Sequence, residues 1–346
     1  MRAGRRPTMR VYIGIDLHSN NCVVVVIGET GRVLYKEKLR NELGLILSEL
    51  APYLKRCAGV AVESTFNWYW LVDGLMEAGY PVHLANSAAI QQYTGLKYTD
   101  DKSDARWLAE MLRLKVLPEG YIYPKEGRAV RDLLRKRRQL VRQKVSQILS
   151  IQDLVARNAG VRLSGNAVKT ITAWDLDRFL PDPLVARAAK SNLQVYRCLV
   201  KEIAALERMI LDQVKDGPGF NNMLSVAGVG KTLGLTVVLE AGDMSRFPDA
   251  GHFASYCRCV GSQKLSNGKK KGKGNTRNGN AHLAWAFVEA AHFAIRYNAI
   301  VKRFYERKKA KTNGIVAIKA VAHKLARASY HVLKDGVPFD VQRAFA

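Results

Sequence analysis

The chain has 346 residues, 48% of them hydrophobic, which is enough for two or three domains with a sizeable core and excludes a globally disordered protein. Its 55 Lys and Arg against 30 Asp and Glu give a formal net charge of +25, so a polyanion is the expected partner. Nucleic acid fits better than an anionic membrane surface, because the positive charge is spread over several segments and no apolar run is long enough to span a membrane.

Residues 9–125 alternate between strand and helix patterns. The predicted elements, in chain order, are strands at 11–16, 22–27 and 32–39, a helix over 42–55, a strand at 59–63, a helix over 68–78, a strand at 80–85 and a helix from Asp101. This order suits a mixed sheet flanked by helices, so we expect an α/β domain with an RNase H-like fold.

Residues 126–216 form a second region, which we expect to be a helical, coiled-coil-like arm. Apolar spacing over 128–158, with eight basic residues from Arg128 to Lys144, predicts a long amphipathic helix with a basic face. A second long helix is predicted over 184–215, and its apolar seam needs cover from another protomer or from helix 128–158. The seam consists of Val195, Leu199, Ile203, Leu206, Ile210 and Val214.

Residues 220–346 are predicted to form a mainly helical C-terminal domain. The stretch 224–231 precedes an apolar helix and resembles a helix-hairpin-helix turn, in which N–H groups at a helix N-terminus hold a DNA phosphate. The stretch 264–280 is rich in Lys, Gly and Asn and has almost no apolar residue, so we interpret it as a basic loop. Residues 281–334 have helical spacing again.

Four carboxylates are the candidate catalytic and metal-binding residues. Asp16 and Glu63 each end a predicted buried strand, where a carboxylate is costly unless a cation compensates it. Asp101 and Asp104 lie three apart on a predicted helix and therefore share one face. Taken singly, each residue could be a turn or capping residue. Together they predict an oxygen-only site for Mg²⁺ or Mn²⁺, of the kind that serves phosphodiester chemistry.

At these residues the chain resembles a known family. Gly14-Ile15-Asp16, Val62-Glu63-Ser64 and Asp101-Lys102-Ser103-Asp104-Ala105 are similar to the Asp-Glu-Asp-Asp signature of the DEDD insertion-sequence transposases. The similarity continues, in the same order, at 226–230, 242–247 and Gly279-Asn280, so it covers nearly the whole chain. It implies a RuvC-like catalytic domain and a C-terminal transposase domain that cut and rejoin DNA. It also implies a structured guide (bridge) RNA, a dimer or tetramer, and a place in the bacterial or archaeal cytoplasm with the nucleoid.

The resemblance further implies a serine nucleophile, which falls on Ser266. Here the chain departs from the family pattern, because it has Ser266-Asn267-Gly268 where the family usually has Ser-Gly. It also has Gly261 where the family often has proline, so Ser262 is a rival.

Cationic residues in three segments are expected to contact the nucleic-acid backbone rather than its bases. They lie on the basic helix, at the start of the helix after residue 230, and around Ser266. They are Arg128, Arg131, Arg135, Arg137, Arg138, Arg142, Lys231, Lys264, Lys269, Lys270, Lys271 and Lys273.

Three other functions remain open at this point. A Holliday-junction resolvase or structure-selective nuclease would use the four carboxylates and no serine. An actin-like ATPase or sugar kinase would use Gly14-Ile15-Asp16 as a phosphate motif, but no later Gly-rich phosphate loop occurs. A non-catalytic binding protein would use the basic helices alone.

Overall fold

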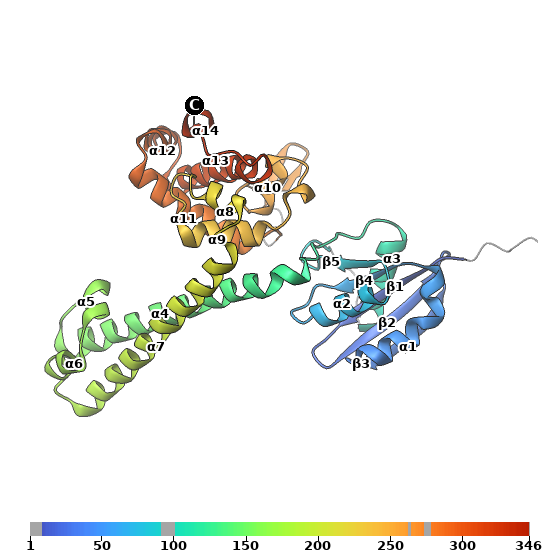
Figure 1. Ribbon diagram of the computed structural model, residues 1–346, viewed down its shortest axis with the longest axis horizontal. Coiled ribbons are helices and arrows are strands. Elements are labelled where there is room, and N and C mark those ends of the chain that lie inside the picture. The colour runs from blue at the N-terminus through green and yellow to red at the C-terminus, as the bar shows by residue number, and fades with distance from the viewer. Residues whose placement is uncertain (1–8, 91–100, 262–263, 273–277, 346) are drawn as a thin grey trace, which may run out of the picture. The chain divides into compact units, whose positions relative to one another are not determined.

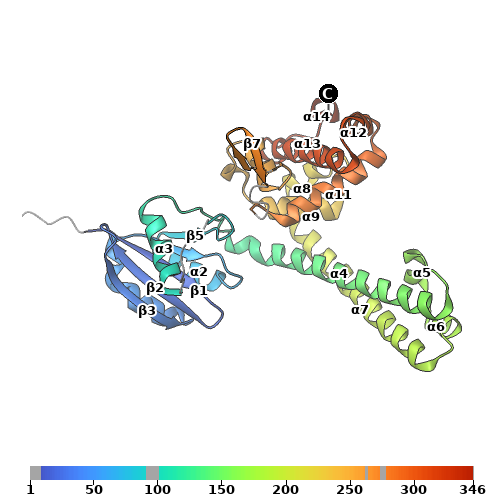
Figure 2. The ribbon, with the colours of Figure 1, turned by 180° about the vertical axis from the view of Figure 1, so that it is seen from behind.

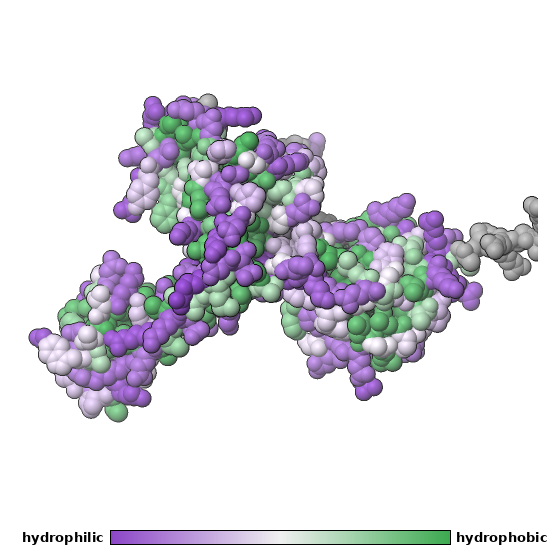
Figure 3. Space-filling model, in the orientation of Figure 1, coloured by the Kyte–Doolittle hydropathy of each residue, from purple (hydrophilic) through white to green (hydrophobic). Residues whose placement is uncertain are grey.

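The computed structural model describes residues 9–90, 101–261, 264–272 and 278–345. The chain divides into two compact units, Met1–Lys125 and Glu126–Ala346 (Figure 1). None of the described helices is both long and apolar enough to cross a membrane. Figure 3 shows hydrophilic residues spread over the visible face of both units.

The first unit is built on a five-stranded sheet with the order β3-β2-β1-β4-β5. Strands β1, β2 and β3 form an antiparallel meander, whereas β4 pairs parallel to β1 and β5 pairs parallel to β4. This is the mixed sheet expected of an RNase H-like fold, so that prediction is confirmed. The strands are β1 (Val11–Leu17), β2 (Asn21–Gly28), β3 (Val33–Arg40), β4 (Cys57–Glu63) and β5 (Val82–Ala85).

Helices cover both faces of this sheet. On one face, α1 (Leu43–Leu50) and α2 (Tyr69–Glu77) pack against β1, β2 and β4 (Figure 1). On the other face lies α3 (Asp101–Arg113) (Figure 2). The single helix predicted over 42–55 is two elements, α1 and the 3-10 helix η1 (Ala51–Arg56), because Pro52 has no N–H to continue the α-helical pattern.

Two long helices open the second unit. α4 (Lys125–Ala159) and α7 (Pro183–Val214) pack antiparallel, since Leu134 shares a core with Ile210 while Ile151 shares another with Leu193. Two short helices that the sequence pattern did not predict, α5 (Gly165–Thr170) and α6 (Ala173–Phe179), complete that second core.

The apolar seam of α7 is covered partly from within the chain. Leu206, Ile210 and Val214 pack against α4 and α9, whereas Val195 is 47% exposed. The intramolecular alternative therefore accounts for the C-terminal half of the seam and leaves Val195 uncovered by the described residues.

The rest of the second unit is a helical domain around Phe253, Phe287 and Leu325. Its elements are α8 (Pro218–Met223), α9 (Lys231–Ala241), η2 (Met244–Arg246), α10 (Ala250–Tyr256), β6 (Lys264–Ser266), β7 (Lys269–Gly272), α11 (Ala281–Tyr297), α12 (Ala299–Lys311), α13 (Gly314–Lys334) and α14 (Val341–Phe345).

The strands β6 and β7 correct one prediction, because part of the stretch taken as a basic loop is a β-hairpin. The turn residues Asn267 and Gly268 have φ values of 51° and 71°. Two consecutive positive φ values are those of a type I′ turn, which favours Asn-Gly and matches the twist of a two-stranded hairpin.

Candidate functional site

Asp16 and Glu63 lie side by side at one edge of the first unit's sheet. Strands β1 and β4 are adjacent and parallel, and their register pairs Ile15 with Val62. The next residue of each strand is therefore a carboxylate at the same, carboxyl end. Asp16 is 3% exposed and Glu63 is half-buried.

Helix α3 brings its first turn toward the same edge. Its Ala105 and Ala109 lie over Gly14: a Cβ at Gly14 would be 1.9 Å from the Ala105 oxygen and 2.7 Å from the Ala109 nitrogen. Further along α3, a Leu112 side-chain carbon would be 3.0 Å from a Cβ at Gly59, near the start of β4. The helix thus runs antiparallel to β1 and β4, so its N-terminal turn, with Asp104, lies at the Asp16 end.

A small polar network surrounds Asp16. His18 Nε2 lies 3.3 Å from Asp16 Oδ2, and the His18 carbonyl accepts hydrogen bonds from Asn41 Nδ2 at 2.9 Å and Asn67 Nδ2 at 3.0 Å. Burial, with a smaller contribution from the Asp16 charge, raises the pKa of Cys22 to about 11. The strand end is therefore held in a fixed position by its neighbours.

The donor atoms at this edge are carboxylate oxygens, which suit Mg²⁺ or Mn²⁺. Within the described ranges, no three His, Cys, Asp or Glu side chains are grouped so as to hold a metal ion. The side chain of Asp101, the fourth predicted ligand, lies outside what the structure describes. The metal site therefore stays a prediction, which rests on the strand-end placement of Asp16 and Glu63.

The basic helix α4 uses several of its cations inside the second unit. Arg135 binds the carboxylate of Glu240 through two hydrogen bonds of 2.7 and 2.8 Å, and Glu240 is 2% exposed. Arg137 donates to Glu207 Oε1 at 2.8 Å, and the guanidinium of Arg138 lies 4.5 Å from the Trp285 ring centroid.

The other three predicted nucleic-acid-binding arginines of α4 differ in their exposure to solvent. Arg128 and Arg131 are buried, whereas Arg142 is exposed. Six arginines of α4 are predicted to contact nucleic acid. Arg142 is exposed, whereas the other five are buried or bind side chains of the same unit.

Glu240 is the centre of a network that sequence reasoning missed. Asn280 Nδ2 donates to Glu240 Oε2 at 2.8 Å, and His282 Nδ1 lies 4.0 Å from Oε1. Burial raises the pKa of Glu240, but the hydrogen bonds and charge of Arg135, with Asn280 and His282, outweigh it, so the net pKa is lowered. A signal was present in the sequence, since a lone carboxylate in the otherwise apolar helix 232–240 needs a buried cation.

Asn280 also links the start of α11 to the end of α10. Asn280 N donates to the Tyr256 carbonyl at 2.6 Å, and Arg258 donates to the Gly279 carbonyl at 3.1 Å through Nε and 2.8 Å through Nη2. These contacts fix the chain where it enters α11.

Ser266 is the last residue of β6, directly before the Asn267-Gly268 turn. Lys269 and Lys271 are exposed on β7, and Lys264 and Lys270 lie on the two strands. Ser262 and Lys273 lie outside the described residues.

The predicted phosphate-binding turn joins α8 to α9. A Cβ at Gly228 would be 2.1 Å from the Ala290 oxygen and 2.6 Å from the Ala294 nitrogen, and its φ is 79°. Gly230 precedes α9 without a side-chain cap, and Lys231 is exposed at its first position.

Comparison with known proteins gives matches in both units. Residues 13–157 match the IS110-type DEDD family model, described as a transposase, and residues 221–306 match a model described as the transposase IS116/IS110/IS902 family. A protein of Streptomyces coelicolor, the insertion element IS110 uncharacterized 43.6 kDa protein, is 26% identical over 137 residues. That alignment covers 39% of this chain and 34% of the relative, about a third of its length.

Proposed function

Because the chain belongs to the IS110 family of transposases, we propose that it cuts and rejoins DNA strands at the ends of an insertion sequence. The observation that carries the proposal is the placement of Asp16 and Glu63 at the carboxyl ends of two adjacent parallel strands. The N-terminal turn of α3, with Asp104, lies at the same edge. Carboxylates from three elements at one sheet edge suit phosphodiester chemistry.

Asp16, Glu63, Asp101 and Asp104 would hold Mg²⁺ or Mn²⁺ in this proposal. A bound divalent ion would supply Lewis-acid stabilisation of charge on the phosphate. The chain's own contribution is positioning: His18 orients Asp16, and the contact of Gly14 with Ala105 and Ala109 sets the position of α3. A fixed geometry of this kind lowers the cost of assembling the reactive arrangement.

Ser266 is proposed as the nucleophile, with Ser262 as the alternative. Its Oγ would form a bond to phosphorus while the bond from phosphorus to the departing strand oxygen breaks. The serine hydroxyl loses its proton, the departing oxygen gains one and becomes a strand hydroxyl, and a phosphoserine ester is left. Rejoining reverses this step with a new strand hydroxyl and needs no ATP. The exposed Lys269 and Lys271 next to the turn would attract the phosphodiester and stabilise its developing negative charge.

The proposed partners are DNA, a structured guide RNA and further copies of the chain. The net charge of +25 and the exposed cations Arg142 and Lys231 support the nucleic-acid partners. Val195 on α7 and Val145 and Leu149 on α4 are exposed apolar residues, at 47%, 45% and 53%, which supports a dimer or tetramer formed through this helix pair.

The experiment uses the purified chain with Mg²⁺ and DNA carrying the element ends, taken from the sequence that flanks the gene. We expect Asp104→Asn to abolish cleavage and leave DNA binding largely intact, with Asp100→Asn as the matched control that stays active. We expect a covalent protein–DNA adduct that mass spectrometry maps to Ser266 and that Ser266→Ala abolishes.

Other outcomes assign the chemistry differently. An adduct on Ser262 would correct the residue and keep the mechanism. Cleavage to free 3′-hydroxyl and 5′-phosphate ends, with no adduct, would contradict the serine proposal and support a structure-selective nuclease.

A further inference from the structure

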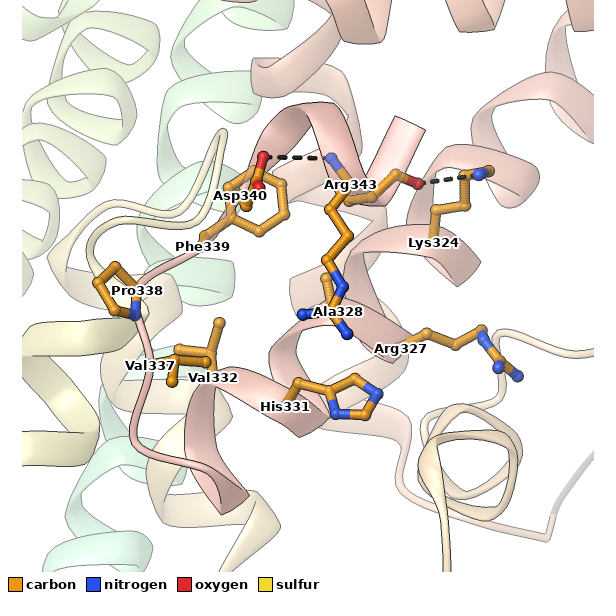
Figure 4. A pocket seen from close by; sticks show the side chains of 11 residues that line it. Lys324, Arg327, Ala328, His331, Val332, Val337, Pro338, Phe339, Asp340 and Arg343 are labelled. Atoms are coloured by element: carbon orange, nitrogen blue, oxygen red, sulfur yellow. Dashed lines mark hydrogen bonds between the residues drawn. The ribbon is translucent and has the colours of Figure 1, made fainter. Parts of the chain in front are cut away.

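A pocket of about 320 Å³ lies in the C-terminal domain, between α13 and the segment that leads into α14 (Figure 4). It is distant in sequence from the four carboxylates and from Ser266. Pockets that hold small ligands begin at about 300 Å³. The size therefore suits one small ligand or one residue of a polymer.

The charged side chains that line the pocket are mostly basic. Lys324, Arg327 and Arg343 stand against one carboxylate, Asp340, and His331 lines the same pocket. Figure 4 shows the Arg343 side chain extending from α14 toward His331 on α13. A concave site with this excess of positive charge attracts an anion.

Several of these groups already have partners. Lys324 Nζ donates to the Ala344 carbonyl at 2.8 Å, and His331 Nδ1 lies 3.0 Å from Asp335 Oδ2. Asp340 Oδ1 accepts hydrogen bonds from the backbone N–H groups of Gln342 and Arg343 at 2.8 and 3.1 Å.

The guanidinium groups of Arg327 and Arg343 lack such partners within the described part of the chain. Both residues are exposed, and neither guanidinium has a hydrogen bond or ion pair within the described part of the chain. Two exposed guanidiniums that line one pocket suit a phosphate, because each presents a fork of donors.

The opposite wall is apolar and held in place. Val337 is 44% exposed and Pro338 is exposed beside it. The Phe339 N–H donates to Ser225 Oγ at 2.9 Å, and the Gly336 carbonyl accepts from Asn222 Nδ2 at 2.9 Å. The wall is thus tied at both ends to the segment around α8, which presents a fixed apolar surface opposite the cations.

We propose that this pocket takes one unpaired nucleotide of a single-stranded nucleic-acid segment, with its phosphate on Arg327 and Arg343 and its base against Val337 and Pro338. A free phosphate would leave the apolar wall unused. A duplex would present phosphates, but its bases are stacked inside and could not reach the wall. The inference rests on the proposed function for its nucleic-acid partner, and single-stranded RNA and DNA share the chemistry it requires.

The test compares two double variants of the full-length chain. Arg327→Gln with Arg343→Gln removes the pocket cations, and Arg303→Gln with Arg307→Gln removes two exposed cations of α12 outside the pocket. Both variants alter exposed side chains and make the same change in net charge. Binding is measured by fluorescence anisotropy with labelled oligo-U and oligo-dT of about 20 nucleotides and with duplex DNA.

We expect the pocket variant to lose ~10-fold or more in single-strand affinity, and the control ~3-fold or less. Duplex affinity should fall by a similar small factor in both variants, because it depends on the overall charge. If the pocket variant loses more affinity for oligo-U than for oligo-dT, the nucleotide comes from RNA. If it loses more affinity for oligo-dT, the nucleotide comes from DNA. Photocrosslinking of 5-iodouridine in the oligonucleotide should label the peptide containing Val337 and Phe339.

Equal single-strand losses in the two variants, or crosslinks confined to other peptides, would overturn the pocket assignment and leave the proposed function intact. Equal losses for single strand and duplex in the pocket variant would overturn the unpaired nucleotide and show plain phosphate attraction. Absence of any binding by the unchanged chain would overturn both this inference and the nucleic-acid partner proposed above.

Discussion

In each unit, a glycine of the candidate functional segment packs directly against the backbone of a helix. In the first, Gly14 of β1 lies against the backbone of Ala105 and Ala109 on α3; in the second, Gly228 lies against that of Ala290 and Ala294 on α11. A Cβ would come within 1.9 Å of an oxygen at Gly14 and within 2.1 Å at Gly228. In both, a missing side chain lets a helix approach the segment that carries or leads to the proposed chemistry.

The two glycines differ in backbone conformation. Gly14 lies in a regular strand, where steric contact alone requires glycine. Gly228 lies in a turn with a φ of 79°, so both contact and conformation require glycine. The strand is also held by its sheet neighbours, whereas the turn depends on this contact and on the ends of α8 and α9.

The largest expected effect is therefore that of Gly228→Ala. Overpacking against backbone costs ~1–3 kcal/mol or more. The left-handed conformation adds ~1–2 kcal/mol for a residue with a Cβ. Gly14→Ala should show the cost of overpacking but not the cost of the left-handed conformation. Hydrogen exchange of the full chain, followed by mass spectrometry, should show faster exchange in the unit that carries each substitution.

Gly44→Ala is the control, because a Cβ at this exposed position on α1 would meet nothing within 4 Å. It should be neutral or stabilising by up to ~1 kcal/mol. Slower or unchanged exchange in α11 for Gly228→Ala would contradict the comparison.

The buried carboxylates of the two units, Asp16 and Glu240, have different neighbours. The first leaves Asp16 at a sheet edge beside His18, whereas the second surrounds Glu240 with Arg135, Asn280 and His282. A satisfied carboxylate of this kind suits a structural connection between α4, α9 and α11. Asp16 lies at the carboxyl end of β1 beside the end of β4, which is where the proposed cation would bind.

A second, smaller effect follows for Arg135→Ala, which leaves the Glu240 carboxylate buried without its cation. We expect a loss of ~2 kcal/mol in the free energy of unfolding, less than for a fully buried pair because Arg135 is about a third exposed. Arg137→Ala is the matched control with a loss of at most ~1 kcal/mol, since its partner Glu207 is 42% exposed. Urea unfolding measures both, and equal losses would contradict a special role for Glu240.

The pH dependence of this pair has a definite sign. The pKa of Glu240 is lowered in the folded chain, so its contribution is present above the ordinary glutamate pKa and is lost as pH falls through the folded-state value. Glu240→Gln should therefore flatten the loss of stability on the acid side and leave the neutral-to-alkaline side unchanged in slope.

Local patterns predicted the elements of both units better than they predicted the contacts between them. Buried strands with Asp16 and Glu63 at or next to their last residue are visible in the sequence, because a short apolar run followed by a carboxylate is a local signal. The break at Pro52 and the hairpin at Asn267-Gly268 were also local signals, but the first lay inside a helical pattern and the second inside a basic stretch without apolar residues.

The Glu240 network could not be predicted in the same way. Its three partners lie 105, 40 and 42 positions away in sequence, and nothing local pairs one arginine of α4 with one carboxylate of α9. The basic face of α4 consequently gave no indication that Arg135 and Arg137 bind carboxylates of the same unit. Side-chain pairing of this type is decided by packing between helices, which the spacing of one helix does not specify.

The smallest expected effect separates the internal cations of α4 from the external ones. Each phosphate contact that is lost lowers the slope of log affinity against log salt by ~0.9 for duplex DNA. Arg142 is exposed, so Arg142→Ala should lower the slope by about that amount while the free energy of unfolding stays nearly constant. Arg135→Ala should do the reverse, because its guanidinium is engaged by Glu240. If Arg135→Ala lowered the slope as much as Arg142→Ala, Arg135 would contact both Glu240 and phosphate, and α4 would then serve as a nucleic-acid interface along its length.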